Sequence, residues 1–313
     1  MDLIPKKDVK SEEWKPNKED SFPTWHKVGK VKSMFVYPLL KGVAESVTSC
    51  GIYCNQICGY KNKFPVLNHM FVVYDEVTNV IYTKNEIPKF KTFTVSFLDK
   101  NAVALKGHSN SIVLILQHIM ADGNIKTCMT SFSNKFLVFV QVLDCGDAIA
   151  EWLRNYTNNN HLRLGYIFNL ELQNTKLEET TNQFKKWNMD NKSYKDFMMP
   201  FECVPPLTLI SSETFDEIVR TCSHEQLQQL SPNIVISSTD EKPFNEKKWQ
   251  KIRIGDHVIV NNINNINLKD RPISQINLKD TPIDMKWELV LLHCEVLFSG
   301  IVEKGDEVFA LYA

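Results

Sequence analysis

Long apolar runs rich in β-branched and aromatic residues constrain this sequence most, because such runs favour strands over helices. Two of them, SIVLILQHI (111–119) and KFLVFVQVLD (135–144), are continuous, as expected for central strands. FKTFTVSFLD (90–99) alternates apolar and polar residues, which predicts a strand with one solvated face. The chain finishes on two more strand-like runs, LVLLHCEVLFSG (289–300) and EVFALYA (307–313). The sequence therefore predicts a fold that is mostly β.

A smaller part of the chain has helical character. Apolar residues recur at helical spacing over 144–158, and a second helix is expected over 211–222, where Ser211 or Ser212 can cap the N-terminus. A short third helix is expected at 224–230. Further strands are expected at 29–41, 69–84 (as two strands joined by a turn at Asp75–Asn79), 232–238 and 251–261. Strands with a few helices predict an α+β protein built of two β-barrel-like layers.

Composition excludes several classes of function. The 313 residues include 36 Lys and Arg and 37 Asp and Glu, which gives a formal net charge of -1. This charge does not favour electrostatic binding of nucleic acid by the protein as a whole. No apolar run approaches the roughly 18 residues that a transmembrane helix requires. The N-terminus is polar and has no apolar signal-peptide region. We therefore predict a cytoplasmic protein with no membrane span and no nucleic-acid partner.

Three of the eight cysteines lie close together. Cys50, Cys54 and Cys58 are spaced by four residues, which on a helix would place three thiols on one face, an arrangement that suits a metal ion. Iron–sulfur sequences use tighter and less regular spacings. We favour buried or loop thiols and predict no metal site here.

Two segments have unusual composition. Residues 1–28 are rich in Lys, Glu, Asp and Pro, and we interpret them as a polar N-terminal arm. An Asn-rich stretch leads into INLKDRPISQ (266–275), which is repeated with one substitution as INLKDTPI (276–283). Two units are too few for a solenoid. The whole segment 261–283 is interpreted as a loop, either drifted or binding a partner.

Six segments in a fixed order carry a family resemblance, and LDCGDAIAEWL is the most specific of them. They are GKVKSMFVYP (29–38), the strand pair at 69–84, LDCGDAIAEWL (143–153), LTLISSETFDEI (207–218), SPNIVIS (231–237) followed by Trp249 and IGD (254–256), and GIVEKGDEVF (300–309). Together they resemble the MOSC superfamily, and in particular its amidoxime-reducing component branch, over about residues 29–313.

The resemblance implies an architecture and a chemistry. It implies an N-terminal MOSC-like β-barrel subdomain over 29–142 and a MOSC β-barrel domain with flanking helices over 143–313. Similar proteins hold a molybdenum–molybdopterin cofactor in a cleft between the two. A Cys thiolate ligates the molybdenum, and cationic groups bind the pterin phosphate. Electrons reach such proteins from a cytochrome b5-type haem protein and a flavoprotein.

The positions that the resemblance assigns to the cofactor have changed residue type. Lys41 matches only the distal Lys of the opening strand, and the Lys-Ser pair before it is missing. Family arginines fall on His69 and Ser231. The molybdenum-ligating Cys falls at or near Asn265, and a late Tyr falls on His293. Each lost charge-assisted hydrogen bond removes roughly 1.5–3 kcal/mol, so several together would lower cofactor affinity by orders of magnitude.

This pattern favours a MOSC-fold pseudoenzyme without a cofactor, acting as a non-catalytic binding or structural protein for an unknown small molecule or protein. The alternative is a divergent molybdenum-cofactor-dependent N-reductase with unusual ligands. In that case Cys294 is the candidate thiolate, and cytochrome b5-type donors would be its partners. Because strand side chains alternate, either His293 or Cys294 can face the cleft, but not both.

Two further groups of residues have a functional and a structural interpretation. His69 and His293 can together ligate a metal, but we favour two unrelated histidines. Asp144 and Cys145 can form a reactive pair. We favour instead a strand end, a turn at Gly146 and a helix start whose acidic first turn includes Asp147.

Overall fold

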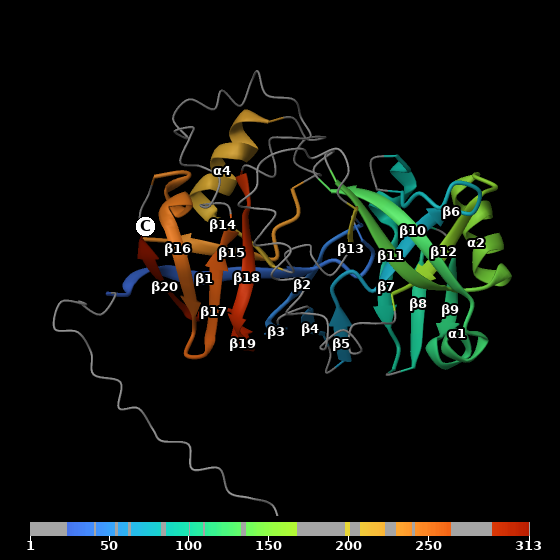
Figure 1. The fold of residues 1–313 in the computed structure, drawn as a ribbon, viewed down its shortest axis with the longest axis horizontal. Helices are drawn as coiled ribbons and strands as arrows, with labels where there is room; N and C mark the ends of the chain where they lie inside the picture. Colours follow the sequence, from blue (N-terminus) through green and yellow to red (C-terminus); the bar gives the residue numbers. More distant parts are fainter. Residues whose placement is uncertain are drawn as a thin grey trace, which may run out of the picture.

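Thirteen segments of the chain are described by the structure, a computed structural model. They are residues 24–40, 42–53, 56–61, 64–82, 86–99, 101–108, 110–132, 136–167, 198–200, 207–222, 230–239, 242–263 and 290–312. Their strands form four sheets. A barrel lies on one side of the molecule and two other sheets lie on the opposite side, with short strands between them (Figure 1).

Seven strands close into the barrel. They are β1 (His26–Val36), β14 (Leu207–Ser211), β15 (Ile234–Ser238), β16 (Trp249–Ile254), β17 (Val258–Asn262), β18 (Leu292–Phe298) and β20 (Glu307–Tyr312). Their order is β15-β14-β18-β17-β16-β20-β1, and β1 pairs back onto β15 to close the ring. A short strand, β2 (Glu45–Val47), extends the sheet beside β1. Closure leaves no unpaired edge within the ring.

The barrel is filled by alternate side chains of its strands, as the period of two in a strand requires. On β16 and β17 these are Ile252, Ile254, Val258 and Val260, all fully buried. Strand β1 can lie against β15 because Gly29 has no side chain: a Cβ there would lie 2.1 Å from the backbone oxygen of Ser237. The apolar residues that alternate along these segments therefore form the barrel core.

Helix α4 (Ser212–Thr221) covers part of the barrel's outer face. Its N-terminus is capped by Ser211, whose hydroxyl accepts a hydrogen bond from the backbone N–H of Thr214 at 3.1 Å. The helix buries Ile218 against Ile210 and Val235, which project outward from β14 and β15.

The second large sheet contains β6 (Phe71–Asp75), β10 (Ile125–Phe132), β11 (Phe136–Asp144), β12 (Leu162–Tyr166) and β13 (Met198–Pro200). Its main order is β10-β11-β12-β6. Bridges from Val80 to Met129 and from Ile81 to Tyr74 join the two outer strands. One face packs around Tyr74 and Val142, and the other packs against helix α2 (Asp147–Thr157), with Leu153 fully buried.

Smaller elements connect these bodies. One four-stranded sheet has the order β19-β3-β4-β5, and a three-stranded sheet has the order β7-β8-β9. Their bounds are β3 (Ser49–Ile52), β4 (Ile57–Lys61), β5 (Phe64–Leu67), β7 (Thr94–Phe97), β8 (Ala102–Lys106), β9 (Ser111–Ile115) and β19 (Gly300–Glu303). The remaining helices are α1 (Leu116–Asp122) and the 3-10 turns η1 (Pro88–Thr92) and η3 (Asn245–Lys248). None of the helices in the described segments is long and apolar enough to span a bilayer.

The predicted fold class is confirmed, because the chain is mostly β with a closed barrel and few helices. The predicted helices at 144–158 and 211–222 are α2 and α4. The single strand predicted over 111–119 is wrong beyond Ile115, where α1 begins because tertiary packing buries Leu116 and Ile119. The first part of 90–99 is likewise η1 rather than strand.

Other sequence predictions meet the structure only in part. The helical arrangement considered for the cysteines is wrong, since Cys50 and Cys58 lie on the antiparallel strands β3 and β4. The predicted helix at 224–230 lies almost wholly outside the described residues, as do residues 1–23 of the predicted arm. The predicted loop at 261–283 begins too early, because β17 continues to Asn262. The Asn262 side chain is buried and its amide donates a hydrogen bond to the Trp249 carbonyl at 2.8 Å.

The predicted division near residue 143 stays a prediction. Strands from each side of this boundary pair with strands from the other side. Strand β1 belongs to the barrel of C-terminal strands, while β12 pairs with β6 of the other sheet. The two bodies are therefore interleaved along the chain.

Candidate functional site

The candidate site lies where the C-terminal end of β1 meets the turn between β5 and β6. Asn68 and His69 form the turn between β5 and β6. Asn68 is buried, and its side-chain oxygen accepts the backbone N–H of Tyr37 at 2.8 Å. The backbone N–H of His69 donates to the Tyr37 carbonyl at 2.7 Å. These contacts hold His69 in the left-handed region at φ 56, which a non-glycine residue adopts only in special turns.

Asn233 connects this turn to the barrel. It is 4% exposed, and its side-chain oxygen accepts the backbone N–H of Thr208 at 3.1 Å. Its side-chain amide donates to the Phe35 carbonyl at 3.2 Å and lies 3.5 Å from the Asn68 side-chain oxygen. One neutral amide thus joins the ends of β1 and β14 to the β5–β6 turn.

Ser231 lies immediately beside this amide network. Its carbonyl accepts the hydroxyl of Thr208 at 3.0 Å, and the Tyr37 hydroxyl donates to the adjacent Pro232 carbonyl, also at 3.0 Å. Burial raises the pKa of Tyr37, an effect partly offset by a side-chain hydrogen bond with Ser231. The Tyr37 hydroxyl is therefore protonated at neutral pH, when it acts as a hydrogen-bond donor.

His293 reaches the same region from β18. It pairs directly with Thr208 across the β14–β18 ladder. Its neighbour Cys294 is fully buried in the barrel core, so the alternation of strand side chains places His293 on the outer face. Both ring nitrogens of His293 are buried. Burial, with the nearby Lys247 ammonium, lowers the pKa of His293 to about 4, so the ring is neutral at pH 7.

Two charged residues lie buried beside His293. Lys247 is 3% exposed and donates to the Leu291 carbonyl at 3.2 Å. Burial lowers the pKa of Lys247 to about 8, although the adjacent Glu246 carboxylate acts in the opposite direction. Glu246 is also buried, and one of its oxygens is 3.4 Å from the backbone N–H of Ser211.

Three of the five predicted site residues are thus brought into one region. His69 contacts Tyr37, Tyr37 contacts Ser231, and Ser231 contacts Thr208, the ladder partner of His293. The other two, Lys41 and Asn265, lie outside the described residues.

The polar groups in this region are imidazoles, hydroxyls and amides, with the buried Lys247 ammonium and Glu246 carboxylate beside them, and the described residues here include no guanidinium group. Burial raises the pKa of Cys294 well beyond neutral pH, so its thiol is protonated as well as turned into the core. The described segments contain no cluster of three or more His, Cys, Asp or Glu side chains that could hold a metal ion. Lys247 is a cation, but the described residues of this region offer no thiol that faces outward, so they do not fit a molybdenum–pterin group, which needs a soft thiolate ligand.

The most specific sequence motif has a structural role. The Asp144 carboxylate accepts two hydrogen bonds from Arg163 at 2.6 Å, one from the Gly146 N–H at 2.8 Å, and the Tyr74 hydroxyl proton. Gly146 adopts φ 88 and Asp147 begins α2, as the structural interpretation predicted. Burial raises the pKa of Asp144, but these hydrogen bonds outweigh it and hold the pKa below its usual range.

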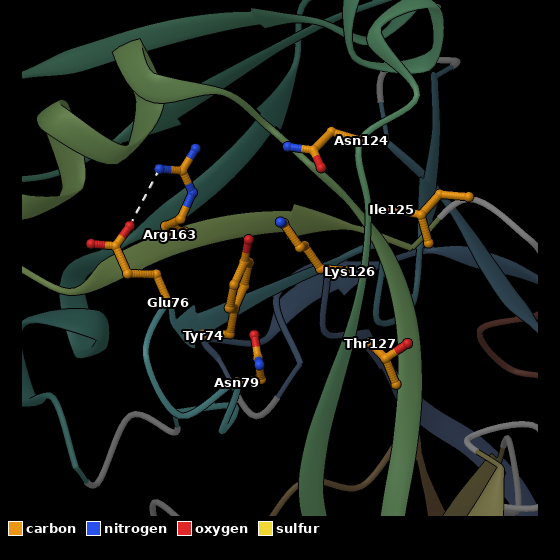
Figure 2. A pocket seen from close by; sticks show the side chains of 8 residues that line it. All are labelled: Tyr74, Glu76, Asn79, Asn124, Ile125, Lys126, Thr127 and Arg163. Atoms are coloured by element: carbon orange, nitrogen blue, oxygen red, sulfur yellow. Dashed lines mark hydrogen bonds and ion pairs between the residues drawn. The ribbon is translucent and has the colours of Figure 1, made fainter.

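A polar pocket lies at one end of this second sheet and was not predicted from the sequence. Figure 2 shows Lys126 extending from β10 toward Tyr74 and Arg163. The pocket combines residues about 35 to 90 positions apart, which no local motif marks. The sequence offered one weak indication of this pocket, which is the single lysine Lys126 in a strand whose next buried residue is Cys128.

Comparison with known proteins gives distant relatives. No family model matches the chain. The mitochondrial amidoxime reducing component 2 of Rattus norvegicus is 23% identical over 235 residues, which is 73% of this chain and 62% of that protein. The proteins of the same name from Bos taurus and Macaca fascicularis are 20% and 19% identical over 231 residues each. The chain therefore matches about three fifths of the length of these relatives, and the similarity supports the amidoxime-reducing component branch of the MOSC family.

Proposed function

We propose that this chain is a MOSC-fold pseudoenzyme that has lost the molybdenum-ligating Cys and the Lys, Ser and Arg set that binds the pterin. It acts as a non-catalytic binding or structural protein. The relatives support the scaffold, because similarity extends over 73% of this chain. The chemistry of His69, Ser231 and His293 supports the loss of the cofactor, because none of these side chains provides a permanent positive charge.

The orientation of Cys294 carries the proposal. Among the thiols of the described segments, only this one lies on a strand beside a former cofactor position, so it is the obvious substitute ligand. It points into the barrel core among apolar side chains, and its pKa is raised by burial. A metal ligand must be accessible to the metal, and a side chain enclosed in the barrel core has no such access.

The polar network supports a structural role for the former cleft. Asn68, Asn233 and Thr208 join the barrel to the second sheet by neutral hydrogen bonds. Neutral bonds stabilise a junction without requiring a charged ligand to balance them. The region that would bind an anionic cofactor in a working enzyme is here suited to hold two bodies of the fold together.

The similarity itself favours one alternative function. The relatives are named as amidoxime reducing components, so a divergent molybdenum-cofactor-dependent N-reductase is the second candidate. Its molybdenum ligand would have to lie outside the described residues or be Cys294. It would take electrons from cytochrome b5-type donors. Localisation in the cytoplasm, with an unknown small molecule or protein as partner, belongs to the first proposal.

Pterin content distinguishes the two proposals. The wild-type chain, Cys294→Ser and an amidoxime reducing component are expressed in a host that makes molybdenum cofactor, then oxidised so that released pterin fluoresces. We expect pterin in the relative and background fluorescence in both forms of this chain. Stoichiometric pterin in the wild type would overturn the proposal, and its loss in Cys294→Ser would identify the ligand.

A further inference from the structure

The pocket at the end of the second sheet is a separate place from the junction described above. Its lining residues come from β6 and the turn after it, from β10 and the residue preceding it, and from β12. Its volume is about 690 Å³, within the usual range for small-molecule sites. Figure 2 shows that Tyr74, Lys126 and Arg163 are directed toward the same space.

The charged groups on the back wall of the pocket are paired with one another. The Glu76 carboxylate accepts two hydrogen bonds from Arg154 at 2.9 and 3.0 Å, and it lies 3.4 Å from Arg163. Arg163 also forms the paired hydrogen bonds to the buried Asp144 carboxylate. Two guanidinium groups therefore contact three carboxylates, of which Asp144 is shielded from solvent and Asp147 is not. Asp147, which also contacts Arg163, has a side chain that is 96% exposed and faces solvent.

The open side of the pocket has unused hydrogen-bonding capacity. The Lys126 ammonium is exposed and forms no hydrogen bond or ion pair within the described segments. The side chains of Asn79, Asn124 and Thr127 line the same pocket and likewise make no hydrogen bond within that part of the chain. One ammonium without an ion pair in the described segments, two amides and a hydroxyl thus line one side of the pocket, and the charged side chains on the other side are paired with one another.

We propose that this pocket binds a small organic anion, with a carboxylate or phosphate group on Lys126 and further oxygens on the Asn79 and Asn124 amides. A charge-assisted hydrogen bond to an ammonium is about twice as strong as a neutral one, so Lys126 dominates affinity. The wall of Glu76 and Arg163 is fixed by its own ion pairs and gives the ligand a pre-formed surface. This inference does not depend on the loss of the molybdenum cofactor.

Calorimetric titration of the full chain at low ionic strength tests the proposal with two probes, inorganic phosphate and citrate. We expect saturable binding of at least one probe, and the preferred probe identifies the anion class. Lys126→Gln should weaken that binding about tenfold or more, the effect of one charge-assisted hydrogen bond. Lys106→Gln, a change at another exposed lysine, on β8, should leave it unchanged.

Asn124→Ala supplies a second, independent variant. Its side chain makes no hydrogen bond to any residue that the structure describes, so the fold should be unaffected, and anion binding should weaken several-fold. Circular dichroism of each variant verifies that the fold is retained. Absence of saturable binding of both probes, or equal binding by the wild type and Lys126→Gln, would overturn the proposal.

Discussion

The substitution Asp144→Asn tests whether the best-matched motif of this sequence is structural. The carboxylate is 1% exposed and accepts two hydrogen bonds at 2.6 Å from Arg163 and one at 2.8 Å from the Gly146 N–H. An Asn side chain keeps the shape but loses the charge, and its amide group would oppose an Arg163 donor. Arg163, with a side chain only 15% exposed, would lose its best-desolvated partner.

The expected loss of unfolding free energy is about 2–4 kcal/mol. Removing one partner of a buried ion pair costs about 3–5 kcal/mol, and the remaining contacts of Arg163 to Glu76 and Asp147 reduce that figure. Asp147→Asn is the matched control, because Asp147 contacts the same guanidinium but its side chain is 96% exposed. Its effect should be much smaller. Urea unfolding at pH 7 measures both, and equal losses would refute the reasoning.

The same carboxylate predicts a pH dependence. The pKa of Asp144 is lowered in the folded state, so the folded protein binds fewer protons than the unfolded chain near pH 4. The stabilisation is therefore complete above the unfolded pKa of about 3.9 and is lost as pH falls through the folded pKa. The stability difference between wild type and Asp144→Asn should shrink below about pH 4. A constant difference down to pH 2 would contradict this assignment.

Three further predictions concern the junction and the packing of the second sheet. Because the pKa of His293 is lowered to about 4, the wild type should lose up to about 3 kcal/mol relative to His293→Gln as pH falls from 6.5 to 4, measured by urea unfolding. Asn233→Ala should cost about 2–3 kcal/mol at pH 7, since it leaves buried backbone groups unpaired, whereas the exposed Asn110→Ala should have little effect. Gly165→Ala places a carbon 2.5 Å from a Val142 methyl group and should lower stability by about 1–3 kcal/mol, and a double-mutant cycle with Val142→Ala should show partial recovery.

Regular apolar patterns made much of the fold predictable. The run over 136–144 became β11, and the capped segment after Ser211 became α4, because local pattern and tertiary burial agree there. The run at 111–119 contains no breaking residue, yet it changes from strand to helix at Leu116. No side chain caps that helix, so its start is set by packing rather than by sequence. The strands at 45–67 are short, and the four-residue spacing of the cysteines there is the spacing expected of a helix, although Cys50 and Cys58 lie on strands.

The candidate site was predictable only as a set of positions. His69, Ser231 and His293 were identified by resemblance, and the structure places them in one region. The residues that connect them were not predicted, because Asn68 and Asn233 are 165 positions apart and no local pattern marks their contact. Nor does sequence spacing alone say which of two neighbouring strand residues faces the core, which decided the role of Cys294.

The molybdenum content of the purified chain tests the central claim most directly. The wild type and a cofactor-loaded amidoxime reducing component are produced in the same cofactor-synthesising host, and molybdenum per chain is measured by elemental analysis. The account predicts a ratio near zero for this chain beside a loaded relative. A ratio near one molybdenum per chain would contradict it and show that the chain is a molybdoenzyme with ligands of a different type.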